Sequence, residues 1–313
     1  MLICRLSCSR HEEEHAVMYQ QIISLTPVPP FDFAQTLRFI GDFSPGEGEQ
    51  QVTGATLTRA LRVAGQMIVC RVASHGTVDA PALTCDLFAA APIGAESVAT
   101  ARDRVSFWLG LTDNLRPFYA TAARDAAFAP AVRAWYGYHQ VKFLTPFENA
   151  CWAVLAQRSP LAVSRLMKDR LVARFGGECT VNGETYAAFP EPADLAGVPP
   201  DALVETLRNA RKADYLHAVI EAWQQVDEAW LRTGPYDDVE RWLRGIRGIG
   251  AWSASFVLIR GLGRMERIPP EDALTRAAAR IYGHPLSDAE FAAVAAQYGA
   301  MQGYWGHYLR VAT

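Results

Sequence analysis

Two stretches of this sequence combine residue types and spacings that could do chemistry. The first is RGIRGIGAWSA, residues 244–254, in which Gly248 and Gly250 enclose Ile249. Glycine allows backbone angles and close approaches that a Cβ forbids, and the first turn of a helix leaves several N–H groups without partners. A glycine turn that opens into a helix therefore favours the binding of a phosphate group. A plain helical hairpin, with Ile249 as a core residue, is the alternative interpretation.

The second stretch, RIPPEDALTRA, places Glu271 and Asp272 after two prolines, at the expected start of another helix. The helix dipole and free N–H groups keep a carboxylate in that position ionised. A fixed negative charge can stabilise positive charge that develops in a transition state. Aspartate is also a common helix cap, so a purely structural role stays open for both residues.

The charge distribution points to a local patch and not to a basic protein. The 313 residues are 50% hydrophobic and 20% charged with a net charge of −3, which is typical of a globular chain of one or two domains. Residues 241–280 nevertheless hold eight arginines against three acidic residues, a local charge of +5. We expect any polyanion to bind there.

The N-terminal residues, MLICRLSCSRHEEEH, become charged before the apolar region of a secretory signal could form. No apolar run approaches the roughly 20 residues that a membrane-spanning helix needs. We therefore expect a cytoplasmic protein with reduced thiols and no membrane role, nucleoid-associated in a bacterium. Cys4, Cys8, His11 and His15 superficially suggest a metal set, but their spacing does not match a zinc finger, and we interpret residues 1–17 as a flexible leader.

The hydrophobic pattern predicts an α+β fold class. Residues 31–43 have helical spacing, and TLTRALRV, QMIVCRVAS and ALTCDLFAA follow as strands of an antiparallel meander. After about Glu96 the pattern becomes helical and does not change back. We predict a small N-terminal domain with an antiparallel sheet, residues 18–125, followed by a larger all-α domain, residues 126–313.

Two long helices open the predicted helical domain. In TPFENACWAVLAQ, Thr145 is expected as the N-cap, with Pro146 and Glu148 in the first turn. The next helix, PLAVSRLMKDRLVARF, is expected to stop at Gly176 and Gly177.

The run L-x-x-I-x-G-I-G-x-W-x-A, followed by P-x-D with Asp272 located 22 residues after Gly250, resembles the helix-hairpin-helix DNA glycosylases. Within that superfamily it is most similar to the DNA-3-methyladenine glycosylase II type. The resemblance extends to the predicted sheet and to the helix that begins at Thr145, and it covers nearly everything from about residue 18 to the end. It implies that the helical domain is a helix-hairpin-helix glycosylase domain.

The resemblance assigns Asp272 as the catalytic carboxylate, which would stabilise an oxocarbenium-like sugar and orient water. Trp252 stands where strand-cleaving relatives such as endonuclease III carry a nucleophilic lysine, and an indole cannot form a Schiff base. The resemblance therefore implies hydrolysis without lyase activity. The iron–sulfur cluster of endonuclease III is absent, because Cys179 is the last cysteine.

The resemblance also implies how DNA and the damaged base are held. Trp252, Trp305 and Tyr308 are candidate walls of a base pocket, with ordinary core packing as the alternative for the tryptophans. The candidate DNA-binding residues are Gly248, Ile249, Gly250, Gln157 and Arg158, with Arg158 standing where an apolar wedge is common. No cofactor is required, but a structural monovalent cation is implied at the main-chain carbonyls of Arg244, Ile246 and Ile249.

The resulting hypothesis is a monomeric, monofunctional DNA glycosylase that flips alkylated purines such as 3-methyladenine and 7-methylguanine out of duplex DNA and hydrolyses their glycosidic bond in base excision repair. Three alternatives stay open. The first is a glycosylase of the same fold that removes hypoxanthine, ethenoadenine or an oxidised base. The second is a non-catalytic module that binds damaged DNA, and the third is a helical scaffold for protein partners.

Overall fold

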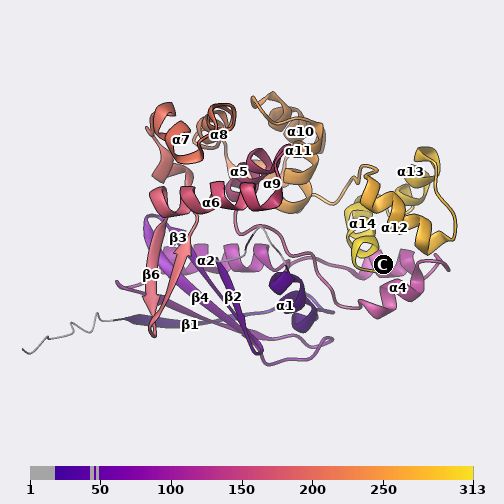
Figure 1. Cartoon of the computed structure of the whole chain (residues 1–313). Helices are drawn as coiled ribbons and strands as arrows, with labels where there is room; N and C mark the ends of the chain where they lie inside the picture. Colours follow the sequence, from indigo (N-terminus) through magenta and orange to yellow (C-terminus); the bar gives the residue numbers. More distant parts are fainter. Residues whose placement is uncertain (1–17, 43–45, 47–48, 313) are drawn as a thin grey trace, which may run out of the picture.

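A five-stranded antiparallel sheet in the order β1-β5-β4-β3-β2 forms the N-terminal part of the chain (Figure 1). Its strands are β1 (Tyr19–Leu25), β2 (Gln50–Thr53), β3 (Thr56–Val63), β4 (Gln66–Ser74) and β5 (Leu83–Ala89). The predicted meander is confirmed as β3 to β5, with Leu61 opposite Ile68 and Val69 opposite Phe88. β1 escaped prediction because only Ile23 and Leu25 of its seven side chains are buried.

The computed structural model describes residues 18–42, 46 and 49–312. The predicted leader at residues 1–17 and its cysteine and histidine set lie outside the described residues. Within the described part, no helix combines the length and the apolar character that crossing a membrane requires.

Two helices complete the core of the sheet domain. α1 (Phe33–Asp42) confirms the predicted helix, and the Asp32 carboxylate accepts hydrogen bonds from the main-chain N–H groups of Ala34 and Gln35 at its start. α2 (Ala95–Trp108) buries Val105 and Trp108 in the same core. The sheet thereby has a well-packed core before the helical part begins.

A second core belongs to the middle helices, which lie above the sheet in Figure 1. These elements are α5 (Pro146–Ala156), α6 (Leu161–Phe175), the 3-10 turn η2 (Pro192–Leu195), α7 (Pro200–Leu207), α8 (Ala210–Trp223), α9 (Glu228–Thr233), α10 (Tyr236–Gly245), α11 (Ala251–Phe256) and the π-helix η3 (Val257–Gly261). The predicted start of α5 is confirmed, because the Thr145 hydroxyl accepts the N–H of Glu148 at 3.1 Å. The predicted stop of α6 is also confirmed, with Gly176 as its C-cap.

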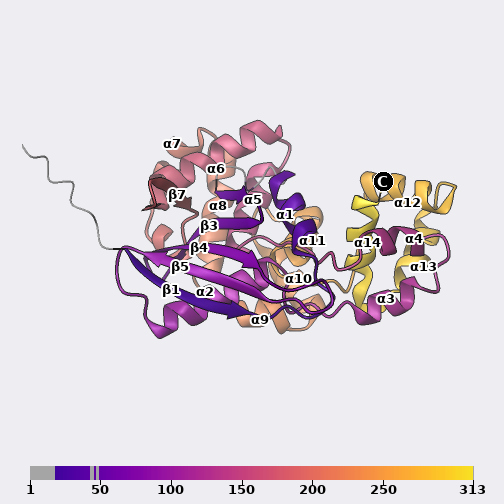
Figure 2. The same ribbon diagram turned by 90° about the horizontal axis from the view of Figure 1, so that it is seen from below.

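A third core joins two segments that are far apart in the sequence (Figure 2). α3 (Arg116–Ala122) and α4 (Ala129–Ala134) pack there with the C-terminal elements α12 (Asp272–Tyr282), α13 (Asp288–Ala296), η4 (Gly299–Met301) and α14 (Gln302–Val311). The predicted domain boundary after residue 125 falls inside this core, between Phe118 and Phe128, whose rings lie edge to face at 6.4 Å.

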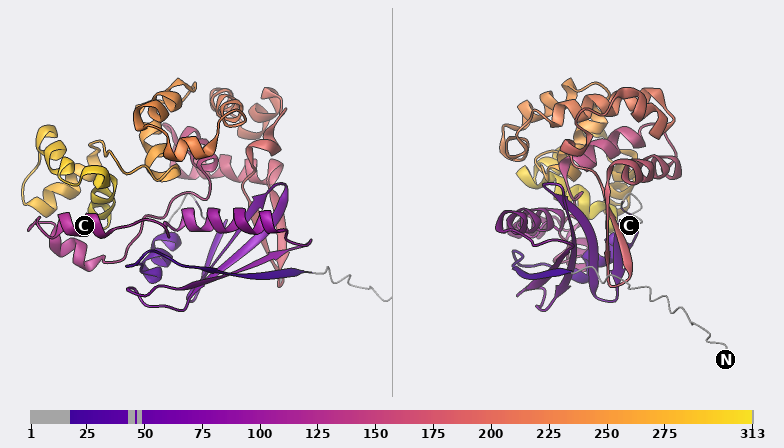
Figure 3. Two further views of the ribbon diagram at one scale, coloured as in Figure 1. Left: turned by 180° about the vertical axis from the view of Figure 1, so that it is seen from behind. Right: turned by 90° about the vertical axis from the view of Figure 1, so that its left-hand side faces the viewer.

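A hairpin of two strands interrupts the helical part, which is therefore mostly but not entirely helical. β6 (Gly177–Val181) pairs with β7 (Glu184–Ala188), and the hairpin stands beside the sheet of the N-terminal domain (Figure 3). Its Val181 and Tyr186 share a small core with Val69 and Phe88 of that sheet. The hydrophobic pattern after Glu96 did not predict this hairpin, because two strands of five residues are too short to show a clear alternation of apolar and polar residues.

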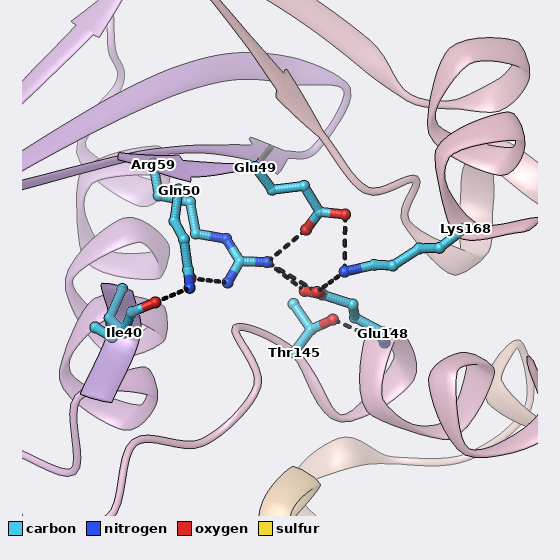
Figure 4. A network of polar contacts seen from close by, with 7 residues as sticks. All are labelled: Ile40, Glu49, Gln50, Arg59, Thr145, Glu148 and Lys168. Atoms are coloured by element: carbon cyan, nitrogen blue, oxygen red, sulfur yellow. Dashed lines mark hydrogen bonds and ion pairs between the residues drawn. The ribbon is translucent and has the colours of Figure 1, made fainter. Parts of the chain in front are cut away.

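Four buried charged side chains join the sheet domain to the middle helices (Figure 4). Arg59 on β3 binds Glu148 on α5 at 2.8 Å and Glu49 at 2.9 Å, while Lys168 on α6 binds the same two carboxylates at 2.8 and 2.7 Å. All four residues are at most 7% exposed. Because two positive charges meet two negative ones, no charge is buried without a partner, although each ion has lost its water.

The network makes stability depend on acidity. Despite burial, which acts in the opposite direction, Arg59 and Lys168 lower the pKa of Glu148 from 4.5 to about 2. A carboxyl whose pKa is lower in the folded state stabilises fully above its unfolded pKa, and this contribution disappears as pH falls from about 4.5 towards 2. Burial raises the pKa of Glu49, so this group offsets part of the effect.

We predict that Glu148→Gln lowers the free energy of unfolding by about 3–5 kcal/mol at neutral pH, because it leaves buried cations short of a partner. The acid-dependent loss of stability between pH 4.5 and 2 should become shallower than in the wild type. Glu205→Gln is the matched control, since its pair with Arg174 is solvent-exposed and should contribute at most about 1 kcal/mol. Urea denaturation at several pH values measures both effects, and equal losses in the two variants would contradict the prediction.

Candidate functional site

The turn between α10 and α11 requires glycine at position 248. Gly248 has φ of +93°, and a Cβ there would lie 2.4 Å from Cγ of the Tyr215 ring on α8. A side chain is thus excluded both by backbone conformation and by the packed ring. Ile249 next to it is buried in the core of the middle helices, which is the role that a plain hairpin predicts for its side chain.

Gly250 differs, because nothing lies within 4 Å of the position that its Cβ would take. Gly250 is the N-cap of α11 and has no side chain that could cap the helix. The N–H groups of Ala251, Trp252 and Ser253, in the first turn, therefore have no hydrogen-bond acceptor within the helix. Folding alone does not require a glycine here. The open space and the first turn of α11 together form a surface on which the main chain can approach an anion closely.

Gln157, at the C-cap of α5, holds this hairpin in place. Its side-chain amide donates to the carbonyl of Gly248 at 2.6 Å and to the hydroxyl of Ser253 at 2.9 Å. Lys212 supports the same helix end, because its ammonium group donates to the carbonyls of Val154, Leu155 and Gln157. The predicted DNA-binding Gln157 is thereby seen to position the turn.

A groove of about 950 Å³ brings most of the predicted site residues together. Its lining comprises residues 156–159, Asn209, Arg211, Lys212, Tyr215 and residues 244–253. Arg158 is exposed and has φ of +50°, a left-handed conformation that is uncommon for residues with a side chain. Arg158 directly follows Gln157 at the end of α5. The Arg158 side chain lines the groove, while the Gln157 side chain forms hydrogen bonds to the hairpin.

Trp252 is half exposed, and its ring stacks on Phe256 one turn later with centroids 5.4 Å apart and planes 8° from parallel. The side chain lines the groove and keeps much of its surface open. An exposed indole fixed by a second ring is a platform for a flat or cationic group.

The two neighbouring carboxylates at the start of α12 have different surroundings. Glu271 is the N-cap residue and forms an ion pair of 2.6 Å with Arg310 on α14. Asp272 is exposed, and among the described residues its carboxylate makes no hydrogen bond or ion pair. Of the two carboxylates, that of Glu271 is therefore held in an ion pair, whereas that of Asp272 is accessible to a ligand.

Trp305 and Tyr308, the other two predicted pocket residues, are fully buried in the core that α12 shares with α14. The indole N–H of Trp305 donates to the Tyr282 hydroxyl at 3.2 Å, and the hydroxyls of Tyr308 and Tyr119 are 2.8 Å apart. Both side chains have the contacts that core packing predicts. In this arrangement neither reaches the groove that Trp252 lines.

The residues are thus distributed over two bodies. The hairpin, Gln157, Arg158 and Trp252 belong to the middle helices, whereas Asp272 belongs to the body of α12 to α14, shown apart from the middle helices in Figures 1 and 2. The sequence interpretation missed Tyr215 and Arg211. Both stand on α8, more than thirty residues before Gly248, and no local pattern marks them. Tyr215 is revealed by its packing on Gly248, and Arg211 by its place in the lining of the groove.

Comparison with known proteins bears on the fold of the chain and on its similarity to DNA glycosylases. No protein-family model matches the chain. The chain is 31% identical to the DNA-3-methyladenine glycosylase of Bacillus subtilis over 167 residues, which cover 53% of this chain and 55% of that protein. This chain spans about half the length of the curated relatives that it matches.

Solved structures extend the similarity to the whole fold. The 3-methyladenine DNA-glycosylase from Archaeoglobus fulgidus matches with a TM-score of 0.75 at 18% identity, over 92% of this chain and 97% of that one. The 8-oxoguanine glycosylase/lyase from Clostridium acetobutylicum, in complex with double-stranded DNA, matches with a TM-score of 0.67 at 14% identity, over 94% and 96%. The predicted resemblance is confirmed, and the chain has the fold of the helix-hairpin-helix DNA glycosylases.

We predict that Gly248→Ala destabilises the protein by roughly 1–3 kcal/mol, because the methyl group meets Tyr215 and forces a left-handed conformation. Gly250→Ala should leave the free energy of unfolding nearly unchanged. Urea denaturation of the two variants tests this directly. In the double variant Gly248→Ala/Tyr215→Ala the two losses should be less than additive, since the clash is gone, and strict additivity would contradict the packing argument.

Proposed function

We propose that this chain is a monofunctional DNA glycosylase, which hydrolyses the N-glycosidic bond of alkylated purines such as 3-methyladenine and 7-methylguanine in duplex DNA. The observation that carries the proposal is the Asp272 carboxylate, which has no hydrogen bond or ion pair within the described part of the chain, whereas its neighbour Glu271 pairs with Arg310. In the same chain the glycine hairpin leaves main-chain N–H groups open. The sequence similarity to a DNA-3-methyladenine glycosylase supports the choice of substrate class. We further propose that the protein acts as a cytoplasmic monomer in base excision repair.

The open N–H groups at the start of α11 would bind a backbone phosphate, while Arg158 would occupy the space that the flipped base leaves in the stack. Flipping costs a few kcal/mol, which contacts to the extruded base must offset. Alkylated purines such as 7-methylguanine carry positive charge, so the exposed face of the Trp252 indole attracts them. Uncharged purines gain less from that contact, which favours the damaged base.

In the reaction the bond between the base nitrogen and C1′ of the sugar breaks, and the base takes the bonding electrons. Positive charge builds on C1′ and the ring oxygen, where the Asp272 carboxylate would stabilise it. Water adds its oxygen to C1′ and loses a proton to Asp272 or to solvent, which leaves an abasic sugar.

Lyase chemistry would need an amine that attacks C1′, and the groove offers none in an available state. Lys212 lines the groove, and burial lowers its pKa. Its ammonium group nevertheless donates to three main-chain carbonyls at 2.6 to 3.0 Å, an arrangement that uses all three of its protons. Trp252 at the hairpin cannot form a Schiff base, so the proposal excludes strand cleavage.

A monovalent cation is part of the proposal. The carbonyls of Arg244 and Ile246 lie at the C-terminal end of α10, where the helix dipole favours positive charge, and Ile249 follows in the turn. A carbonyl oxygen has two lone pairs, so that of Ile246 can bind an ion in addition to the hydrogen bond that it accepts. Neutral carbonyl oxygens suit such an ion. When bound, it would reinforce the turn that Ile249 closes by donating its N–H to the carbonyl of Ile246 at 3.0 Å.

We predict that wild-type protein releases 3-methyladenine or 7-methylguanine from methylated duplex DNA, measured by chromatography, without strand nicks until alkali is added. Asp272→Asn should lower the single-turnover rate by at least about 10²-fold, since the charge that stabilises the sugar is gone. Glu271→Gln is the matched control and should retain most of the rate, because its carboxylate already pairs with Arg310. A panel with hypoxanthine, ethenoadenine and oxidised bases tests the substrate class.

Three outcomes would overturn parts of this proposal. Lesion-selective binding without release of any base would indicate a non-catalytic binding module. Release of a different damaged base only would overturn the assignment of alkylated purines as substrates but would leave the glycosylase activity in place. Nicking of DNA before alkali would show lyase activity and contradict the role given to Trp252.

We also predict that Gly250→Ala weakens binding to undamaged duplex several-fold, because its methyl group fills the space through which a phosphate reaches the N-terminus of α11. Gly41→Ala on α1 is the control, since its Cβ also meets nothing within 4 Å but stands away from the groove. Fluorescence anisotropy at fixed salt compares the two. Equal affinities would mean that DNA does not approach the hairpin at Gly250.

A further inference from the structure

In the arginine-rich segment at residues 241–280, some guanidinium groups form ion pairs within the protein and others do not. Four of its eight arginines form ion pairs: Arg241 with Asp238, Arg247 with Asp214, Arg264 with Glu266 and Arg267 with Asp237. Arg260 lies over the Phe39 ring. Among the described residues, Arg244, Arg276 and Arg280 have no ion pair. Arg244 lines the hairpin groove, but the other two stand on α12.

Arg276 and Arg280 meet a third arginine around a separate hollow of about 320 Å³. They are one turn apart on α12, and Arg310 reaches the hollow from α14, while Ala273 and Ala277 leave room between them. All three arginines are exposed. Like charges one helical turn apart repel each other by a few tenths of a kcal/mol, so the fold gains nothing from this arrangement.

The interior behind the hollow does not neutralise this charge. His307, one turn before Arg310 on α14, is buried, and its pKa is held well below the usual value by burial and then by Arg260 and Arg310. It therefore stays neutral. Burial, and to a smaller extent the charge of Arg310, lowers the pKa of Arg260 to about 10, which is still well above neutral pH. Among the described acids, Glu271 alone pairs with an arginine of the hollow.

We propose that Arg276, Arg280 and Arg310 bind a backbone phosphate of the DNA strand that carries the excised base. The inference rests on the proposed function and adds a second phosphate site to the hairpin. The location supports it, because Ala273 in the lining directly follows Asp272, and Glu271 links the same turn to Arg310. A phosphate held there keeps the adjoining sugar near the Asp272 carboxylate.

The chemistry of the hollow suits a phosphate better than a carboxylate or a flat base. Guanidinium groups recognise the oxygens of a phosphate in pairs, and three of them from two helices surround a tetrahedral anion more completely than a planar one. The small alanine side chains allow a bulky, backbone-linked group to approach. Since Arg276 and Arg280 would act through the position of the sugar, they are positioning residues and not catalytic ones.

The test uses the full chain and a duplex with an abasic-site analogue, so that binding is measured whether or not the protein cleaves a base. We expect Arg276→Ala/Arg280→Ala to weaken binding about tenfold or more. The slope of log K against log salt concentration should become shallower by about 1, because the contact to one backbone phosphate is lost. Arg276→Lys/Arg280→Lys should recover most of the slope. The charge-matched control is Arg116→Ala/Arg133→Ala, two exposed arginines on α3 and α4 of the same body.

A salt slope in the alanine variant equal to that of the control variant would overturn the proposal. A second result would also overturn it. If inorganic phosphate raises the Tm of the wild type but not of the alanine variant, and the salt dependence of DNA binding is the same in both, the hollow binds free phosphate and not DNA. If the slope falls as expected but wild-type protein releases no base, the phosphate site stands and the proposed glycosylase function fails. If base release occurs, the alanine variant should show a raised KM with a smaller change in kcat than Asp272→Asn.

Discussion

Helix α5 is held at both ends, and the position of the candidate site depends on this constraint. In its first turn Glu148 joins the buried network with Arg59, Glu49 and Lys168, which ties the helix to the sheet (Figure 4). At its last turn Gln157 donates to the carbonyl of Gly248 and to Ser253. Ions buried in this way add little net stability, but they accept only one geometry, because every other arrangement leaves a charge without a partner. The hairpin is thereby placed relative to the sheet through a single rigid helix.

The hairpin assigns different roles to two glycines that look equivalent. Gly248 is needed by the fold itself, since its backbone is left-handed and Tyr215 packs where a Cβ would stand. Gly250 faces open space at the start of α11, and its lack of a side chain serves an approaching ligand. One glycine therefore supports the turn, and its neighbour keeps the N-terminus of the helix accessible.

In the body formed by α12 to α14, some charged side chains are likewise held in ion pairs, whereas others are accessible to a ligand. Glu271 is held by Arg310, so the negative charge that remains accessible at the start of α12 is that of Asp272. Arg276 and Arg280 stand on the next two turns without ion pairs among the described residues. An accessible carboxylate thus borders a cluster of accessible cations, which suits a substrate that carries a phosphate on one side and develops positive charge on its sugar.

Local sequence determined the elements of this protein, and tertiary packing decided how they serve a site. The meander β3 to β5, the capped start of α5, the glycine turn before α11 and the carboxylate at the start of α12 were all predictable, because each depends on side chains within a few residues of one another. The β6–β7 hairpin was not, since its short strands are stabilised by the distant sheet. Nor could the sequence separate Trp252, which is exposed, from Trp305, which is buried against Tyr298 and Phe291. Burial, and ion pairs such as Arg247 with Asp214 and Arg267 with Asp237, depend on residues tens of positions or more apart. Only the folded chain therefore decides which aromatic rings and which of the eight arginines are available to a ligand.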